Sequence, residues 1–171
     1  RGVVYAFGTA LWRGSVGHIA LQAPIVDLEP VPVGTGYWLT AADGGVFAFG
    51  DAQYLGGLGN RSLYRPVIDL LSTTDGNGYL LIGADGSVHA YGSARFRGSL
   101  ANNDVSSSRI VAAERTPDGR GYWMVSQRGK VFTFGSAAHL GQMNAHELAP
   151  IGAFAIGGTG DGYWMATSTP P

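Results

Sequence analysis

Short apolar runs separated by turn residues recur along the whole chain. In residues 66–107 the apolar runs are 67–73, 79–84, 87–92 and 94–100. These runs are too short for typical helices, and turn residues recur about every 8–12 residues, which is typical of all-β domains. Asp85-Gly86, between the second and third runs, is a strong two-residue hairpin signal. The pattern therefore predicts four antiparallel strands in this segment and no helix.

The same order of strands and turns repeats with a period of 42 residues. An aromatic-glycine pair closes each third run, and a glycine-tyrosine pair opens each second run, at Gly36, Gly78, Gly121 and Gly162. Repeats with four strands at about this period are blades of β-propellers. We number the repeats 1 (24–65), 2 (66–107) and 3 (108–149); residues 150–168 form a C-terminal half-repeat, and residues 1–23 form an N-terminal half-repeat.

The two half-repeats add up to one complete repeat. Residues 1–23 carry the third and fourth strand patterns, and residues 150–168 carry the first and second. We therefore expect one domain, 1–171, folded as a four-bladed β-propeller whose last blade is closed by strands from both termini. Closure would pair 162–168 with 2–8 and remove the exposed sheet edges. A seven-bladed ring would need about twice this chain, so it could form only from a fragment or from two chains that share a ring.

Composition narrows the functional classes. The chain has 171 residues, 28 of them glycine, and a net charge of −1. It has no basic cluster of the kind that nucleic-acid binding needs, so we expect no nucleic-acid partner. Its apolar runs are far shorter than the ~20 residues of a membrane-spanning helix. It contains no cysteine, which excludes disulfides, zinc-thiolate sites and cysteine nucleophiles.

The stretch GYWLTAADGGVFAFGDAQYLGG from Gly36, and the similar stretch 116–137, resemble a tandem repeat of secreted actinobacterial proteins. In that family the repeat is often appended to cell-wall hydrolases or other extracellular domains. The copy at Gly78 departs from the family pattern, with Leu80 in place of tryptophan and His89 in place of phenylalanine. The resemblance covers the whole chain and carries no catalytic motif. It implies a scaffold that is secreted or located in the cell envelope.

The connectors between repeats are the candidate binding surface, because they differ most from copy to copy and loops on rigid scaffolds usually carry binding. The alternative is that nothing constrains them. Trp12 is a further candidate in a fourth strand, where it either contacts a partner or covers the blade core as an edge residue. The candidate connector residues are His18, Asn60, Arg61, Tyr64, Asn102 and His146.

Two other residue sets have competing interpretations. Asp27 and Asp69 share one place in the first strand, which lines the channel of a propeller. They could hold a cation together with carbonyl oxygens, or they could accept hydrogen bonds from backbone amides. The sequence gives no other cofactor or metal candidate. Trp38, Trp123 and Trp164 share one place in the second strand, which favours packing over sugar stacking.

These features favour a non-catalytic extracellular or cell-envelope module that recognises a glycan or a partner protein through loops on one propeller face. The alternative is a structural domain that positions a neighbouring catalytic domain. The terminal sequence STPP would suit a semi-rigid linker to such a larger chain or assembly. An enzyme acting on glycans has the least support, because no pair of residues with general acid and base character is apparent.

Overall fold

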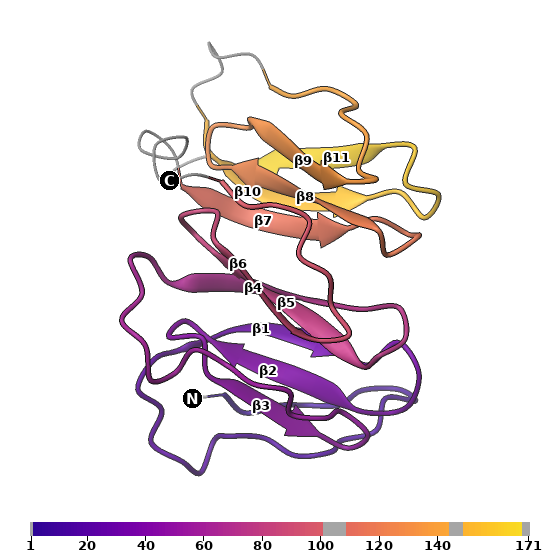
Figure 1. Cartoon of the computed structure of the whole chain (residues 1–171). Coiled ribbons are helices and arrows are strands. Elements are labelled where there is room, and N and C mark those ends of the chain that lie inside the picture. Colours follow the sequence, from indigo (N-terminus) through magenta and orange to yellow (C-terminus); the bar gives the residue numbers. More distant parts are fainter. Residues whose placement is uncertain (1, 101–108, 144–148, 169–171) are drawn as a thin grey trace. The chain divides into compact units, whose positions relative to one another are not determined.

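The structure, a computed structural model, describes residues 2–100, 109–143 and 149–168, and these form antiparallel β-sheets without an α-helix (Figure 1). Each repeat contributes one sheet. The strands are β1 (Ile25–Pro30), β2 (Tyr37–Ala41) and β3 (Val46–Phe49) in repeat 1; β4 (Val67–Ser72), β5 (Gly78–Gly83) and β6 (Val88–Gly92) in repeat 2; β7 (Ile110–Arg115), β8 (Gly121–Ser126) and β9 (Val131–Gly135) in repeat 3; and β10 (Ile151–Ile156) and β11 (Tyr163–Thr167) in the C-terminal half-repeat.

Turn chemistry fixes these hairpins. Between the second and third strands, Gly44, Gly86 and Gly129 adopt φ of 79°, 76° and 76°, a region that favours glycine. In the first of these turns the carboxylate of Asp43 accepts a hydrogen bond of 2.9 Å from the backbone N–H of Gly45. The Asp-Gly signal in the sequence therefore predicted the turns at Gly44 and Gly86 for a physical reason, whereas Gly129 follows Arg128.

The expectation of four strands per blade is wrong for the described residues, because each complete sheet has three. The fourth segments are interrupted by glycines at φ of 130–139°, where a regular strand cannot continue. Their backbone groups bond elsewhere. The Tyr79 hydroxyl donates to the carbonyl of Gly56 (2.6 Å), and the backbone N–H of Leu58 donates to the carbonyl of Gly44 (2.7 Å).

The closing pair of strands is not formed in the structure. In the part of the chain that is described, β11 pairs with β10 in a two-stranded sheet, and residues 2–23 contain no strand. By contact density the chain divides into two compact units, Arg1–Leu81 with His89–Ala94, and Ile82–Val88 with Arg95–Pro171. The all-β architecture predicted from the repeat is confirmed, while the closed four-bladed ring stays a prediction.

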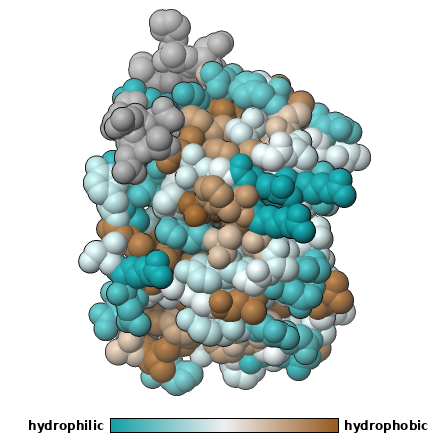
Figure 2. All heavy atoms as spheres, viewed as in Figure 1, coloured by the Kyte–Doolittle hydropathy of each residue, from teal (hydrophilic) through white to brown (hydrophobic). Residues whose placement is uncertain are grey.

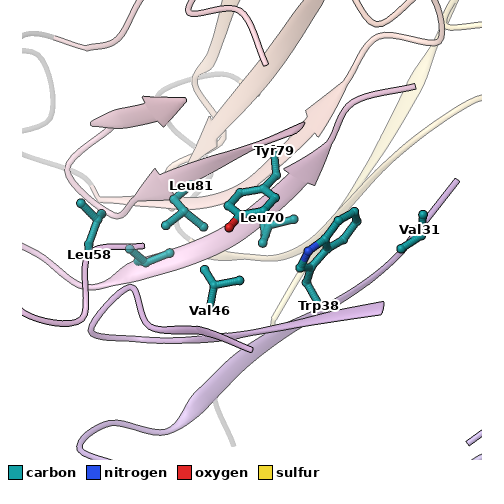
Figure 3. Close-up of a cluster of buried hydrophobic side chains, with 8 residues drawn as sticks. Val31, Trp38, Val46, Leu58, Leu70, Tyr79 and Leu81 are labelled. Carbon is teal, nitrogen blue, oxygen red and sulfur yellow. The ribbon is translucent and has the colours of Figure 1, made fainter. Parts of the chain in front are cut away.

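The core of the first compact unit forms where one sheet packs on the next. Figure 3 shows side chains from β2, β4 and β5 gathered in one buried cluster, with Trp38, Leu70 and Tyr79 among them. The rings of Trp38 and Tyr79 meet edge to face with centroids 5.6 Å apart. The Trp38 indole N–H donates to the carbonyl of Gln53 at 2.8 Å. Trp123 makes the equivalent bond to Ala138 in the second unit, so neither indole is free to stack on a sugar.

Candidate functional site

Three side chains of the first compact unit form a mixed aromatic and cationic patch, which we call the Tyr54 patch: Tyr54, Arg61 and Tyr91. Tyr54 lies in the fourth segment of repeat 1 and is 63% exposed. Arg61 and Tyr54 both act electrostatically on the Tyr91 phenol. Burial raises the pKa of Tyr91 above its ordinary value, and the positive charge of Arg61 acts in the opposite direction. The guanidinium therefore lies within electrostatic range of this half-buried phenol.

The connector that follows the Tyr54 patch is anchored at both ends. The backbone N–H of Arg61 donates to the carbonyl of Leu58 at 2.7 Å, and that of Val67 donates to the carbonyl of Ala42 at 2.9 Å. Between them, Tyr64 is 81% exposed, and the centroid of its ring lies 5.9 Å from the guanidinium carbon of Arg65. An exposed tyrosine next to an arginine can take part in cation–π contacts and hydrogen bonds with a ligand.

The other residues named from the sequence have separate environments. His18 and Asn60 are exposed on their connectors. Trp12 is also exposed, and its indole N–H donates to the carbonyl of Val4 at 3.2 Å, which ties the N-terminal half-repeat together. Asn102 and His146 lie outside the described residues. The structure therefore places Arg61 and Tyr54 within electrostatic range of Tyr91, but it does not gather all the predicted residues into one site.

The two candidate channel carboxylates, Asp27 and Asp69, accept hydrogen bonds from the same backbone N–H. The backbone N–H of Leu70 donates to Asp27 at 3.0 Å and to Asp69 at 3.1 Å. Burial raises the pKa of the Asp27 carboxyl to about 6, and the nearby charge of Glu29 adds to this rise. Glu29 accepts hydrogen bonds from both the backbone and the hydroxyl of Ser72. These carboxylates connect β1 to β4, and the described residues contain no group of three or more His, Cys, Asp or Glu suited to a metal ion.

A second polar network stabilises the turn between the first and second strands. In repeat 2 the Asp75 carboxylate accepts hydrogen bonds from Thr73, Asn77 and Ser93. These bonds, the one from the Thr73 hydroxyl first, hold the pKa of Asp75 below its ordinary value. Repeat 3 builds the same arrangement around Asp118. Because the network recurs, it belongs to the fold rather than to a binding site.

Sequence reasoning did not include Tyr54, Arg65 and Tyr91 among the candidate binding residues. A signal for Tyr54 was present, since it occupies the same repeat place as Trp12. Tyr91 could not be found from the pattern, because it ends a third strand and fills a place that is aromatic in every repeat. Its proximity to the charge of Arg61 depends on how a connector folds back, and the repeat does not encode this.

The face of the molecule in Figure 2 carries hydrophobic atoms interspersed with hydrophilic ones. The exposed large apolar side chains include Tyr5, Phe7 and Trp164 in the half-repeats, and Tyr54 and Tyr64 in repeat 1. Across residues 2–100, 109–143 and 149–168 there is no helix with the length and apolar character required to cross a membrane.

Comparison with known proteins gives information on the fold. No family model matches the chain, and no curated protein matches it. Among solved structures, the C-terminal WD40 domain of Sif2 matches with a TM-score of 0.61 at 16% sequence identity. The match covers 88% of this chain and 45% of that one, so the chain spans about half the length of the matched domain. At this identity the likeness shows the fold alone, which is that of a WD40-like β-propeller.

Proposed function

We propose that the chain is a non-catalytic protein-interaction module that binds its partner through the Tyr54 patch and the connector after it. One observation carries this proposal. Tyr54 and Tyr64 are large aromatic side chains that the fold leaves exposed, on a segment whose backbone is fixed by hydrogen bonds. Tyrosine and arginine are enriched among the residues that contribute most to protein–protein binding.

A preformed surface supports binding because little conformational entropy is lost when the partner arrives. The connector is held at Leu58 and Val67 by backbone hydrogen bonds, and the charge of Arg61 acts on Tyr91. Residues 57–65 contain two arginines and no acidic residue. A partner segment with acidic and aromatic side chains would complement this charge and these rings.

Site-specific photocrosslinking tests the proposal. A photoreactive phenylalanine analogue at Tyr64 should crosslink one protein from an extract of the source organism. The same analogue at Thr74, exposed at the opposite end of β4, should not crosslink it. Tyr54→Ala combined with Arg61→Glu should abolish the crosslink and leave the melting temperature within about 2 °C, since exposed substitutions usually cost less than about 0.5 kcal/mol. Equal crosslinking from Thr74, or from the double variant, would contradict the proposal.

Glycan recognition, a secreted or cell-envelope location and a linker function for STPP stay predictions from the resemblance. A glycan array with the isolated chain tests the first. Sugar-competed binding that is lost in Tyr64→Ala would assign the connector to a glycan instead of a protein. Absence of any partner for the isolated chain, with binding only by a longer chain, would favour the structural domain that positions a catalytic neighbour.

A further inference from the structure

An apolar cavity of about 390 Å³ lies in the first compact unit, between the N-terminal half-repeat and the sheet β1–β2. Carbon-rich side chains dominate its lining, and Thr9 and Thr35 add hydroxyl groups. A cavity of this size is large enough for a side chain of a partner segment. Its principal apolar lining residues are Val4, Ala6, Ala10, Leu11, Leu28 and Tyr37.

The equivalent residues of the next repeat surround the buried indole of Trp38. Each stands 42 residues after one of the lining residues: Val46, Ala48, Ala52, Gln53, Leu70 and Tyr79. Five of them belong to or pack against the Trp38 cluster, and the carbonyl of Gln53 accepts the indole N–H. The cavity is therefore built as the site for a second-strand tryptophan.

Of the three second-strand tryptophans, one is not buried in a site of this kind. Trp164 in β11 is 69% exposed, whereas Trp38 and Trp123, at the same repeat place, are buried. The lining of the cavity is exposed in the same way: Leu28 is 46% exposed, whereas its equivalent Leu70, which packs near Trp38, is 1% exposed. Burying an aromatic side chain of this size is strongly favourable, so Trp164 and the cavity are complementary.

Polar residues show the same complementarity. In each three-stranded sheet, one carboxylate and one hydroxyl join the turn after the first strand to the residue after the third strand. The bonded pairs are Thr35 with Asp51, Asp75 with Ser93, and Asp118 with Ser136. In the half-repeats, Asp161 after β10 stands at the repeat place of Thr35, and Thr9, which lines the cavity, stands at that of Asp51, so the hydroxyl and carboxylate of repeat 1 are exchanged. The place of Asp75 and Asp118 holds Thr159. The pair needed to join the two half-repeats is present.

We propose that β11 of a second copy of this chain binds along residues 2–9, with its Trp164 in the cavity and its Asp161 bonded to Thr9. Each of two copies gives β11 to the other, which forms a closed two-chain ring. Strand addition of this kind pairs the free edge of β11 through backbone hydrogen bonds. Both exposed edges are then covered, and a two-fold ring leaves no site for further growth.

The length of the matched domain favours a second copy over closure within one chain. The chain covers 45% of the Sif2 WD40 domain, so two copies together supply a comparable number of repeats. Closure within one chain would instead make a ring with half as many repeats. The proposal does not depend on the Tyr54 patch, and its test uses no outside partner.

Light scattering and sedimentation of the 171-residue chain should show a dimer. Trp164→Ala and Leu28→Arg should each raise the dimer dissociation constant by at least about thirtyfold, the loss expected for a central interface residue. Val33→Arg is the matched control, because Val33 is exposed, does not line the cavity and has charged equivalents in Asp75 and Asp118. This variant should stay dimeric.

Cysteine crosslinking distinguishes the possible sources of β11, because the natural chain has no cysteine. A Thr9→Cys chain mixed with an Asp161→Cys chain should form a covalent two-chain species under mild oxidation. A monomer in which Thr9→Cys and Asp161→Cys join within one chain would overturn the proposal in favour of the four-repeat ring. A monomer without any crosslink, or assemblies larger than two chains, would also overturn it.

Discussion

Replacing Thr40 by valine should stabilise the protein. Thr40 lies in β2 with no exposed surface, and its hydroxyl Oγ1 has no hydrogen-bond partner. A buried hydroxyl without a partner costs about 1–3 kcal/mol. Valine has nearly the same shape, and the added methyl group contributes roughly 0.8 kcal/mol of burial. The equivalent places in repeats 2 and 3 hold Ile82 and Val125, both buried, so the site accepts a branched apolar side chain.

We expect Thr40→Val to raise the free energy of unfolding by about 1–3 kcal/mol, measured by denaturant titration with an unchanged m-value. The reverse change, Val125→Thr, is the matched control and should lower it by a similar amount. If the two compact units unfold in separate transitions, Thr40→Val shifts the transition of the first unit and Val125→Thr that of the second. A neutral or destabilising Thr40→Val together with a neutral Val125→Thr would refute the reasoning.

Three further predictions concern polar groups. Burial raises the Asp27 pKa to about 6, so the folded state keeps a proton that the unfolded state has lost. The free energy of unfolding therefore falls by up to about 3 kcal/mol as pH rises from about 4 to about 6. Asp27→Asn should remove this fall, which melting curves recorded across that pH range would show. Tyr79→Phe should cost about 1–3 kcal/mol in denaturant titrations, because the hydroxyl bonds both Leu55 N–H and Gly56 C=O. The pKa of Asp118 is lowered, mainly by the hydrogen bond from the Thr116 hydroxyl. Its ionised carboxylate therefore stabilises the fold above about pH 4, and this stabilisation disappears as pH falls through the lowered pKa. In Asp118→Asn the melting temperature should depend less on pH in this acid range.

The repeat predicted the parts of the fold that depend on local chemistry. Asp-Gly turns and alternating apolar runs determine the hairpins, and Gly44 and Gly86 adopt the positive φ that the pattern requires. The fourth strand was predicted incorrectly because its disruption depends on a distant group. The backbone of Gly56 bonds to the hydroxyl of Tyr79, a residue of the next repeat, instead of to a neighbouring strand.

The candidate site was only partly accessible to sequence reasoning. Exposure of Arg61 and Tyr64 follows from their place in a polar connector, and the structure agrees. The cavity beside Leu28 could not be recognised from residue types, because its lining repeats ordinary core positions. It becomes visible only when the environment of each residue is compared with that of its equivalent 42 residues later, as for Leu28 and Leu70.

The hydrogen bond between a second-strand tyrosine and a fourth-segment glycine would allow the half-repeats to accept the proposed partner strand. This bond joins each repeat to the one before it, and it is present for the half-repeats too: Tyr37 donates to Gly14, and Tyr163 donates to Gly141. The backbone positions of β11 and of the N-terminal half-repeat are therefore fixed by neighbouring repeats before any partner strand arrives. Ordering such an edge costs little at the moment of binding, and an unpaired edge strand that is already ordered is a template for another strand. Contacts that run between neighbouring repeats thus hold the cavity lining and the edge of β11 in the positions that the proposed strand pairing requires.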